Sequence, residues 1–182
     1  AKTAAVEPRD GEAYELDYDE LVLATGAEPL VPPMFDVEAL DHCHTLRTVS
    51  EAVEIREQVD DAERALVIGA GYIGIEVAEN LHEAGHSVVV AELFDQVMPN
   101  TLGDEMATLV ESHLREQGVE LQLGAGVEDL TEADDGTITA AMDSGEAREF
   151  DLVVIATGVK PRTGLAEAAG LDLHDSGAIP VD

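Results

Sequence analysis

Three glycines and one glutamate carry the clearest chemical signal in this sequence. Gly69, Gly71 and Gly74 follow the pattern Gly-x-Gly-x-x-Gly, and Glu92 stands roughly 20 residues further on. In such a motif the first glycine permits a tight turn, the second lets a pyrophosphate approach the main chain, and the third lets a helix pack closely on a strand. A carboxylate at that distance can accept hydrogen bonds from both ribose hydroxyls of an adenosine. These residues predict a site for a nicotinamide dinucleotide.

The sequence around the glycines has the elements that this motif requires. Residues 65–68 form an apolar run typical of a buried strand, and a helix is expected over residues 72–84. Residues 87–91 predict a second buried strand, which Glu92 closes. The alternative is an ordinary βαβ unit with a glycine turn, and the complete set of elements favours the dinucleotide site.

The start of the helix after the glycines is expected to hold the phosphates. The N–H groups of Tyr72 and Ile73 have no acceptor within the helix, and the positive end of the helix dipole lies at the same place. Glu92 would repel the 2′-phosphate of NADP, and residues 93–96 contain no Arg or Lys to hold that phosphate. We therefore expect NAD(H) as the cofactor, with NADP less favoured.

The remaining pattern predicts an α/β fold with a Rossmann-like parallel sheet, covering helices and a three-stranded antiparallel meander. Further helices are expected over residues 46–61, with Ser50 as the N-cap, and over residues 103–117. Short alternating runs separated by turn residues predict the meander between residues 124 and 150. Residues 152–156 predict a third buried strand.

The first part of the chain is expected to be rich in β-structure and to end in an irregular crossing. Residues 21–24 are apolar and predict a buried strand that runs into a turn at Gly26. Residues 28–33 contain three prolines and are expected to be irregular. Residues 21–26 and 152–158 both place an apolar run before Ala-Thr-Gly, which hints at two related nucleotide-binding halves.

The strongly negative net charge is the most unusual feature of the composition. Asp and Glu number 40 against 9 Lys and Arg, which gives a formal net charge of −31. The acids are spread along the chain, which favours adaptation to high salt over an acidic interaction tail. At about 1 M ionic strength the Debye length is roughly 3 Å, so the self-repulsion would be largely screened. The same charge makes nucleic acid and anionic membranes poor partners.

Cys43 is the single cysteine, so no internal disulfide can form and a reducing, cytoplasmic location is expected. The triplet from His42 to His44 invites a metal or redox interpretation. Three consecutive side chains do not converge easily on one ion, so we expect no metal site and a structural or surface thiol. Two roles are open for Lys160: it forms an ion pair with an acid, or it approaches a phosphate. No run of 18 apolar residues is present to span a membrane.

Several longer motifs resemble the pyridine nucleotide-disulfide oxidoreductases, and most of all their coenzyme A disulfide reductases and NADH oxidases. The resemblance covers most of the chain and is carried by residues 69–76, 78–81, 96–99, 105–107, 118–119 and 155–161. It implies an FAD domain interrupted by an NAD domain. Residues 1–32 would be part of the FAD domain, residues 33–155 the NAD(H)-binding domain, and residues 156–182 the connection back to the FAD domain.

The resemblance also implies roles for four further residues. Tyr72 matches a tyrosine that acts as a lid over the nicotinamide pocket, and Glu76 matches a glutamate close to the nicotinamide ring. Thr157 and Gly158 would line the NAD groove. From residue types alone, Tyr72 is an aromatic at a helix start and Glu76 an ordinary helical acid. No residue of this chain is expected to be catalytic in its own right.

The activity implied by the resemblance is the transfer of hydride from NADH to FAD, with electrons passing on to a disulfide, a thiol intermediate or dioxygen. The family's FAD-binding glycine motif and its redox cysteine would lie outside this sequence. We therefore expect a fragment that binds no FAD tightly and is inactive alone. A ferredoxin or rubredoxin reductase-type flavoprotein and a non-catalytic dinucleotide-sensing module remain as alternatives, and a homodimer is left open.

Overall fold

The computed structural model describes residues 2–181, and the chain divides into two compact units. The larger unit is continuous and spans Glu28–Lys160. The smaller unit combines the chain up to Ala27 with the chain from Pro161 onward. The glycine motif, Glu92, Thr157 and Gly158 lie in the larger unit, whereas residues 21–26 lie in the smaller one.

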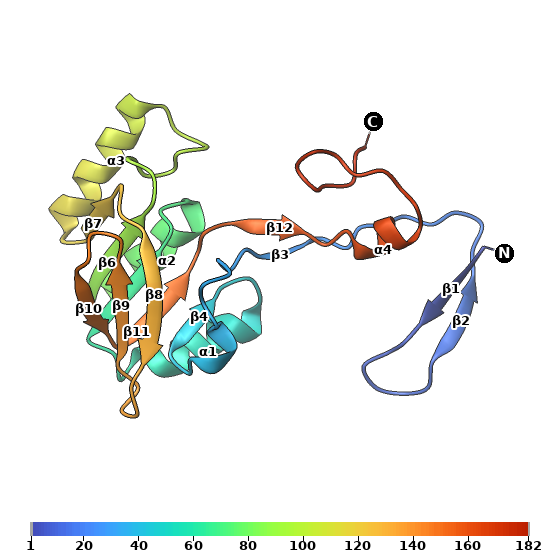
Figure 1. Cartoon of the computed structure of the whole chain (residues 1–182), viewed down its shortest axis with the longest axis horizontal. Coiled ribbons are helices and arrows are strands. Elements are labelled where there is room, and N and C mark those ends of the chain that lie inside the picture. Colours follow the sequence, from blue (N-terminus) through green and yellow to red (C-terminus); the bar gives the residue numbers. More distant parts are fainter. Residues whose placement is uncertain (1, 182) are drawn as a thin grey trace. The chain divides into compact units, whose positions relative to one another are not determined.

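A sheet of five parallel strands forms the centre of the larger unit, in the order β4-β11-β5-β6-β7 (Figure 1). Its central strands contain continuous apolar runs because both faces of the sheet are covered. The expected strands over residues 65–68, 87–91 and 152–156 are confirmed. The strands are β4 (Cys43–Thr45), β11 (Leu152–Ile155), β5 (Arg64–Ile68), β6 (Ser87–Glu92) and β7 (Glu120–Leu123).

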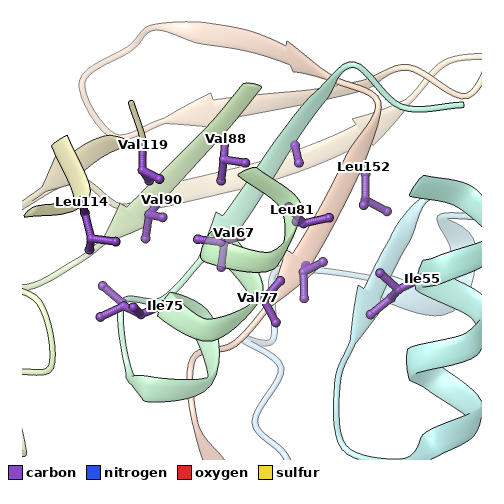
Figure 2. Packing of buried hydrophobic residues seen from close by; sticks show 14 of the residues in the cluster. Ile55, Val67, Ile75, Val77, Leu81, Val88, Val90, Leu114, Val119 and Leu152 are labelled. Atoms are coloured by element: carbon purple, nitrogen blue, oxygen red, sulfur yellow. The ribbon is translucent and has the colours of Figure 1, made fainter. Parts of the chain in front are cut away.

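Three helices pack on one face of this sheet. Alternate strand residues such as Val67 and Val90 point toward that face, where they meet Ile75 and Leu81 of the central helix (Figure 2). The helix that follows the glycine motif therefore lies directly against the strands beside it. The helices are α1 (Val49–Val59), α2 (Tyr72–Glu83) and α3 (Asp104–Gln117).

The opposite face of the parallel sheet is covered by a three-stranded antiparallel sheet in the order β10-β9-β8. Leu66, Val89 and Val153 point to this side and pack against Ile138 and Phe150 of the antiparallel sheet. The expected meander is confirmed, and the larger unit has three layers. The strands are β8 (Val127–Glu132), β9 (Ile138–Met142) and β10 (Ala147–Phe150).

The expected N-cap of α1 is wrong by two residues. Thr48 caps the helix, and its side-chain oxygen accepts a hydrogen bond from the N–H of Glu51. The carboxylate of Glu51 accepts in turn from the N–H of Thr48, at 2.6 Å. This reciprocal pair forms a capping box, which Ser50 cannot form because it lies inside the helix.

Two expectations for the segments outside the central sheet are also wrong. Residues 21–24 form no strand, and Val22 is 86% exposed. No described strand pairs with this run, and an apolar run becomes a strand only where a neighbour completes its hydrogen bonds. The proline-rich crossing contains the short strand β3 (Ala27–Pro29), which pairs with β12 (Val159–Pro161). A proline is tolerated at the end of such a two-stranded ladder.

The smaller unit contains few regular elements. Its antiparallel hairpin joins β1 (Thr3–Val6) to β2 (Tyr14–Asp17), and its one described helix is α4 (Gly164–Ala168). A short 3-10 helix, η1 (Val37–Ala39), belongs to the larger unit. Among the described residues, every helix is too short or too polar to cross a bilayer.

Candidate dinucleotide site

The glycine motif lies at one edge of the parallel sheet, where β5 ends and α2 begins. The strand register places Ile68 beside both Ile155 and Ala91, so the carboxyl ends of β11, β5 and β6 meet at this edge. The chain leaves β5 toward β6 and β7, whereas β11 and β4 lie on its other side. Open α/β sheets bind ligands at such a reversal of strand order.

Each glycine of the motif meets a different steric demand. Gly69 has φ +104°, and a Cβ on it would lie 2.5 Å from the carbonyl oxygen of Ala156. A Cβ on Gly74 would lie 2.0 Å from the carbonyl oxygen of Gly69. A Cβ on Gly71 would meet no described atom within 4 Å. The first and third glycines are therefore required by the fold, whereas the second borders open space.

Helix α2 begins at this open space without a capping side chain. Its N-cap is Gly71, and the N–H of Ile75 donates to the Gly71 carbonyl at 3.0 Å. The preceding amides of Tyr72 and Ile73 belong to the first turn, whose N–H groups have no acceptor within a helix. Space, free donors and the positive helix end together fit a diphosphate.

Glu92 is buried at the end of β6, with 7% of its surface exposed, and it anchors the glycine loop. Its Oε2 accepts a hydrogen bond from the N–H of Ala70 at 2.6 Å. Its Oε1 accepts from the N–H of Phe94 at 3.0 Å. Glu92 thus ties the loop after β5 to the segment after β6, as well as standing where an adenosine ribose is expected.

Ala70 and Met98 complete this anchoring, and neither residue was predicted from the sequence to take part in it. The carbonyl of Ala70 accepts a hydrogen bond from the N–H of Met98 at 2.8 Å. Met98 has φ +48°, a left-handed conformation that non-glycine residues rarely adopt. The only available signal was the motif of residues 96–99, which resembled the family without indicating what it contacts.

Thr157 and Gly158 follow β11 at the same edge of the sheet. The hydroxyl of Thr157 donates to the carbonyl of Leu30, and the carbonyl of Gly158 accepts from the N–H of Leu30 at 2.9 Å. Both residues therefore hold the proline-rich segment of residues 28–33 at the border of the site. Tyr72 is 62% exposed at the start of α2, and Glu76 is exposed one turn later on the same helix.

Cys43 lies inside the protein, where burial in the first place and Glu132 in the second raise the pKa of its thiol to about 12. The neighbouring imidazoles have separate partners. Nδ1 of His42 lies 2.5 Å from Glu132, and Nε2 of His44 lies 2.6 Å from Gln58. The thiol is therefore a structural one, because a protonated sulfur is a poor nucleophile and a poor metal ligand.

Lys160 forms an ion pair with Glu28, with Nζ and Oε1 2.9 Å apart. Of the two roles left to this lysine, the pairing with an acid is the one that the structure contains. The two residues come from the paired strands β12 and β3.

A family model described as pyridine nucleotide-disulphide oxidoreductase matches residues 1–182. An NADH oxidase of Methanocaldococcus jannaschii is 35% identical over 164 residues, which is 89% of this chain and 36% of that protein. A NAD-dependent persulfide reductase from A. fulgidus is 44% identical over 100% of this chain and 33% of its own, with a TM-score of 0.91. A water-forming NADH oxidase from Lactobacillus brevis, bound to NADH, is 32% identical over 100% of this chain and 40% of its own, also with a TM-score of 0.91. The chain therefore spans well under half the length of these proteins.

Proposed function

Because the chain belongs to the pyridine nucleotide-disulphide oxidoreductase family, we propose that it is the NAD(H)-binding portion of an FAD-dependent enzyme that passes hydride from NADH to flavin. One observation carries the proposal. The uncapped start of α2 borders open space at Gly71, beside the buried carboxylate of Glu92. The relatives named NADH oxidase and NAD-dependent persulfide reductase support the same cofactor and reaction class.

In this proposal the main chain of α2 binds the pyrophosphate. The N–H groups of Tyr72 and Ile73 donate to the phosphate oxygens, and Gly71 leaves the room that these oxygens need. Gly69 and Gly74 act indirectly, because they bring the helix start to its position beside the strands. Thr157 and Gly158 border the groove from the β11 side.

Glu92 receives the ribose of the adenosine half. Each carboxylate oxygen can accept two hydrogen bonds, so the bonds from Ala70 and Phe94 leave capacity for the ribose hydroxyls. The negative charge of Glu92 and the absence of Lys and Arg from residues 93–96 favour NADH over NADPH.

The nicotinamide end of the cofactor would lie farther along α2. Tyr72 is exposed at the mouth of the site, where it can cover the nicotinamide as a lid, and Glu76 lies one helical turn away. FAD, when bound in the whole enzyme, would accept the hydride and supply the redox chemistry. The task of this chain is to bind and orient the nicotinamide nucleotide.

The division of the chain into domains follows from this assignment. Residues 33–155 form the NAD(H)-binding domain in this proposal, and residues 1–32 and 156–182 belong to the FAD domain. All of the glycine-motif residues and Glu92 lie in the larger compact unit, which supports the central assignment. The charge of −31 and a single buried thiol support a reducing, cytoplasmic setting of high salt.

A titration of the chain with NADH in molar KCl tests the function. Binding of NADH should enhance and shift the fluorescence of the reduced nicotinamide, and NADPH should bind more weakly. A folded chain that leaves NADH fluorescence unchanged across the titration would overturn the proposal. Circular dichroism of the same sample establishes that the chain is folded.

A further inference from the structure

The chain crosses between its two compact units twice, and the two crossing segments have matching sequences. Residues 24–30 read Ala-Thr-Gly-Ala-Glu-Pro-Leu, and residues 156–162 read Ala-Thr-Gly-Val-Lys-Pro-Arg. The boundary between the units falls inside both segments, which pair through β3 and β12. We propose that the two Ala-Thr-Gly turns form a matched pair of latches, each of which holds the opposite crossing segment and opens without the other.

The first latch consists of Thr25 and Gly26, which bond to both main-chain polar groups of Arg162. The hydroxyl of Thr25 donates to the carbonyl of Arg162, and the carbonyl of Gly26 accepts from the N–H of Arg162 at 2.9 Å. Gly26 has φ +71°, a left-handed conformation that side chains disfavour. A glycine at this position therefore lets the chain turn directly after the threonine, with its carbonyl directed at the opposite segment.

The second latch consists of Thr157 and Gly158, and it repeats the same two bonds on Leu30. The hydroxyl of Thr157 donates to the carbonyl of Leu30, and the carbonyl of Gly158 accepts from the N–H of Leu30 at 2.9 Å. Gly158 also has a positive φ, +124°. Leu30 and Arg162 hold the same place in their segments, directly after the proline. The arrangement therefore follows from the shared sequence pattern, because it forms in the same way at both crossings.

An ion pair lies between the two latches but contributes less to holding the segments together. Lys160 Nζ and Glu28 Oε1 are 2.9 Å apart, and the two side chains are 58% and 38% exposed. An exposed ion pair stabilises a protein little, because water and dissolved salt screen the attraction. The bonds of the latches join uncharged groups, so salt that weakens the ion pair leaves them in place.

Each latch is contained in one compact unit, which is why the two should open independently. The residues of the first latch and Arg162 belong to the smaller unit, whereas those of the second latch and Leu30 belong to the larger unit. The bonds of the two latches have no atom in common. Local opening depends on the hydrogen bonds within the segment that opens. Loss of one threonine hydroxyl should therefore loosen its own crossing and leave the other closed.

Amide hydrogen exchange of the chain, followed residue by residue by NMR, tests the latches. Valine has nearly the shape of threonine but lacks the hydroxyl, and both threonines are only half-buried. We expect Thr157→Val to speed the exchange of the Leu30 N–H roughly five-fold, the equivalent of one ordinary hydrogen bond, and to leave the Arg162 N–H unchanged. Thr25→Val should give the reverse result.

Serine variants and a variant of the ion pair are the matched controls. Thr25→Ser and Thr157→Ser keep the hydroxyl, so both should exchange as slowly as the wild type. Lys160→Gln, which breaks the ion pair, should leave both N–H groups as protected as before. Trypsin gives a second measurement for the first latch, since it should cut after Arg162 faster in Thr25→Val than in Thr157→Val.

Equal loosening of both N–H groups by either valine variant would contradict independent latches. Valine variants without any change, or serine variants that exchange as fast as the valine variants, would show that the hydroxyls hold nothing. If a variant fails to fold, the wild type still decides: N–H groups of Leu30 and Arg162 that exchange as fast as in an unstructured peptide would overturn the latches. None of these measurements involves NADH, so their outcome is separate from that of the proposed function.

Discussion

Gly74 packs so closely against Gly69 that a Cβ on Gly74 would lie 2.0 Å from the Gly69 carbonyl oxygen. Real side chains never approach a main-chain oxygen at that distance. Glycine at position 74 therefore allows α2 to pack directly against the end of β5. Gly71 stands between them in sequence and borders open space instead. One short motif thus contains two residues that the fold needs and one that borders the space in which we propose that the pyrophosphate binds.

Substitution of Gly71 by valine should therefore weaken NADH binding and leave the stability of the fold nearly unchanged. The valine side chain would enter the space left for the pyrophosphate, and we expect NADH affinity to fall by roughly 100-fold, the equivalent of two lost charge-assisted hydrogen bonds. The melting temperature should stay within a few degrees of the wild type, since a Cβ on Gly71 contacts no described atom within 4 Å. Fluorescence titration and thermal melts measure the two quantities.

Gly74→Ala is the matched control for that experiment. Its Cβ has no room, so we expect unfolding to become easier by about 3 kcal/mol or more. A Gly71→Val protein that still binds NADH with wild-type affinity would place the cofactor elsewhere. A Gly74→Ala protein as stable as the wild type would contradict the packing of α2 on β5.

Cys43 should be unreactive in the folded protein. Its buried thiol, with a pKa raised to about 12, is almost entirely protonated at pH 8. We expect a thiol reagent such as DTNB to modify it orders of magnitude more slowly in the native state than in guanidinium chloride. Cys43→Ala should leave NADH affinity unchanged. Rapid modification of the native protein would show that the strand β4 opens, or that the thiol has a functional role.

Thermal stability should rise with the concentration of KCl. With a net charge of −31, the folded chain repels itself in dilute buffer, and ions screen that repulsion. We expect the melting temperature to climb by several degrees or more between low salt and molar KCl. An uncharged osmolyte such as sucrose at matched osmolality is the control. An equal rise in sucrose would mean that exclusion from the surface, rather than screening, stabilises the protein.

Asp151 should contribute a stability that disappears in acid. The side chain of Arg64 donates to its carboxylate at 2.8 Å and, together with the main-chain N–H groups of Glu63 and Arg64, lowers the pKa of Asp151. A lowered pKa in the folded state stabilises the protein above the unfolded pKa of an aspartate, about 3.9, and this contribution is lost as the pH falls below it.

The variant Asp151→Asn tests this contribution. It should be less stable than the wild type at neutral pH by about 1 kcal/mol, since the pair is partly exposed. The difference should shrink as the pH falls below about 3.9. Urea unfolding at a series of pH values gives the two free energies. A difference that stayed constant down to pH 2 would show that the charge of Asp151 has no part in it.

The elements around the site were predictable because their signals are local. The apolar run of β5, the glycines and the apolar run of β6 follow one another within a short stretch of sequence. The pattern of each segment indicates its conformation without reference to distant residues. The run at residues 21–24 looked similar but forms no strand, because a strand also needs a partner that a local pattern does not reveal. For the same reason the sequence placed Glu92 at the site without showing its bonds to Ala70 and Phe94.

The two ends of the larger unit lie next to each other. The chain enters it through β3 and leaves it through β12, and these strands pair in one two-stranded sheet. A module with adjoining ends can be gained, lost or transplanted by a single exchange in the gene, since a short peptide can close the gap at either side. The pairing of β3 with β12 thus makes the larger unit, with the dinucleotide site that we propose in it, a segment that one genetic exchange could transfer as a whole.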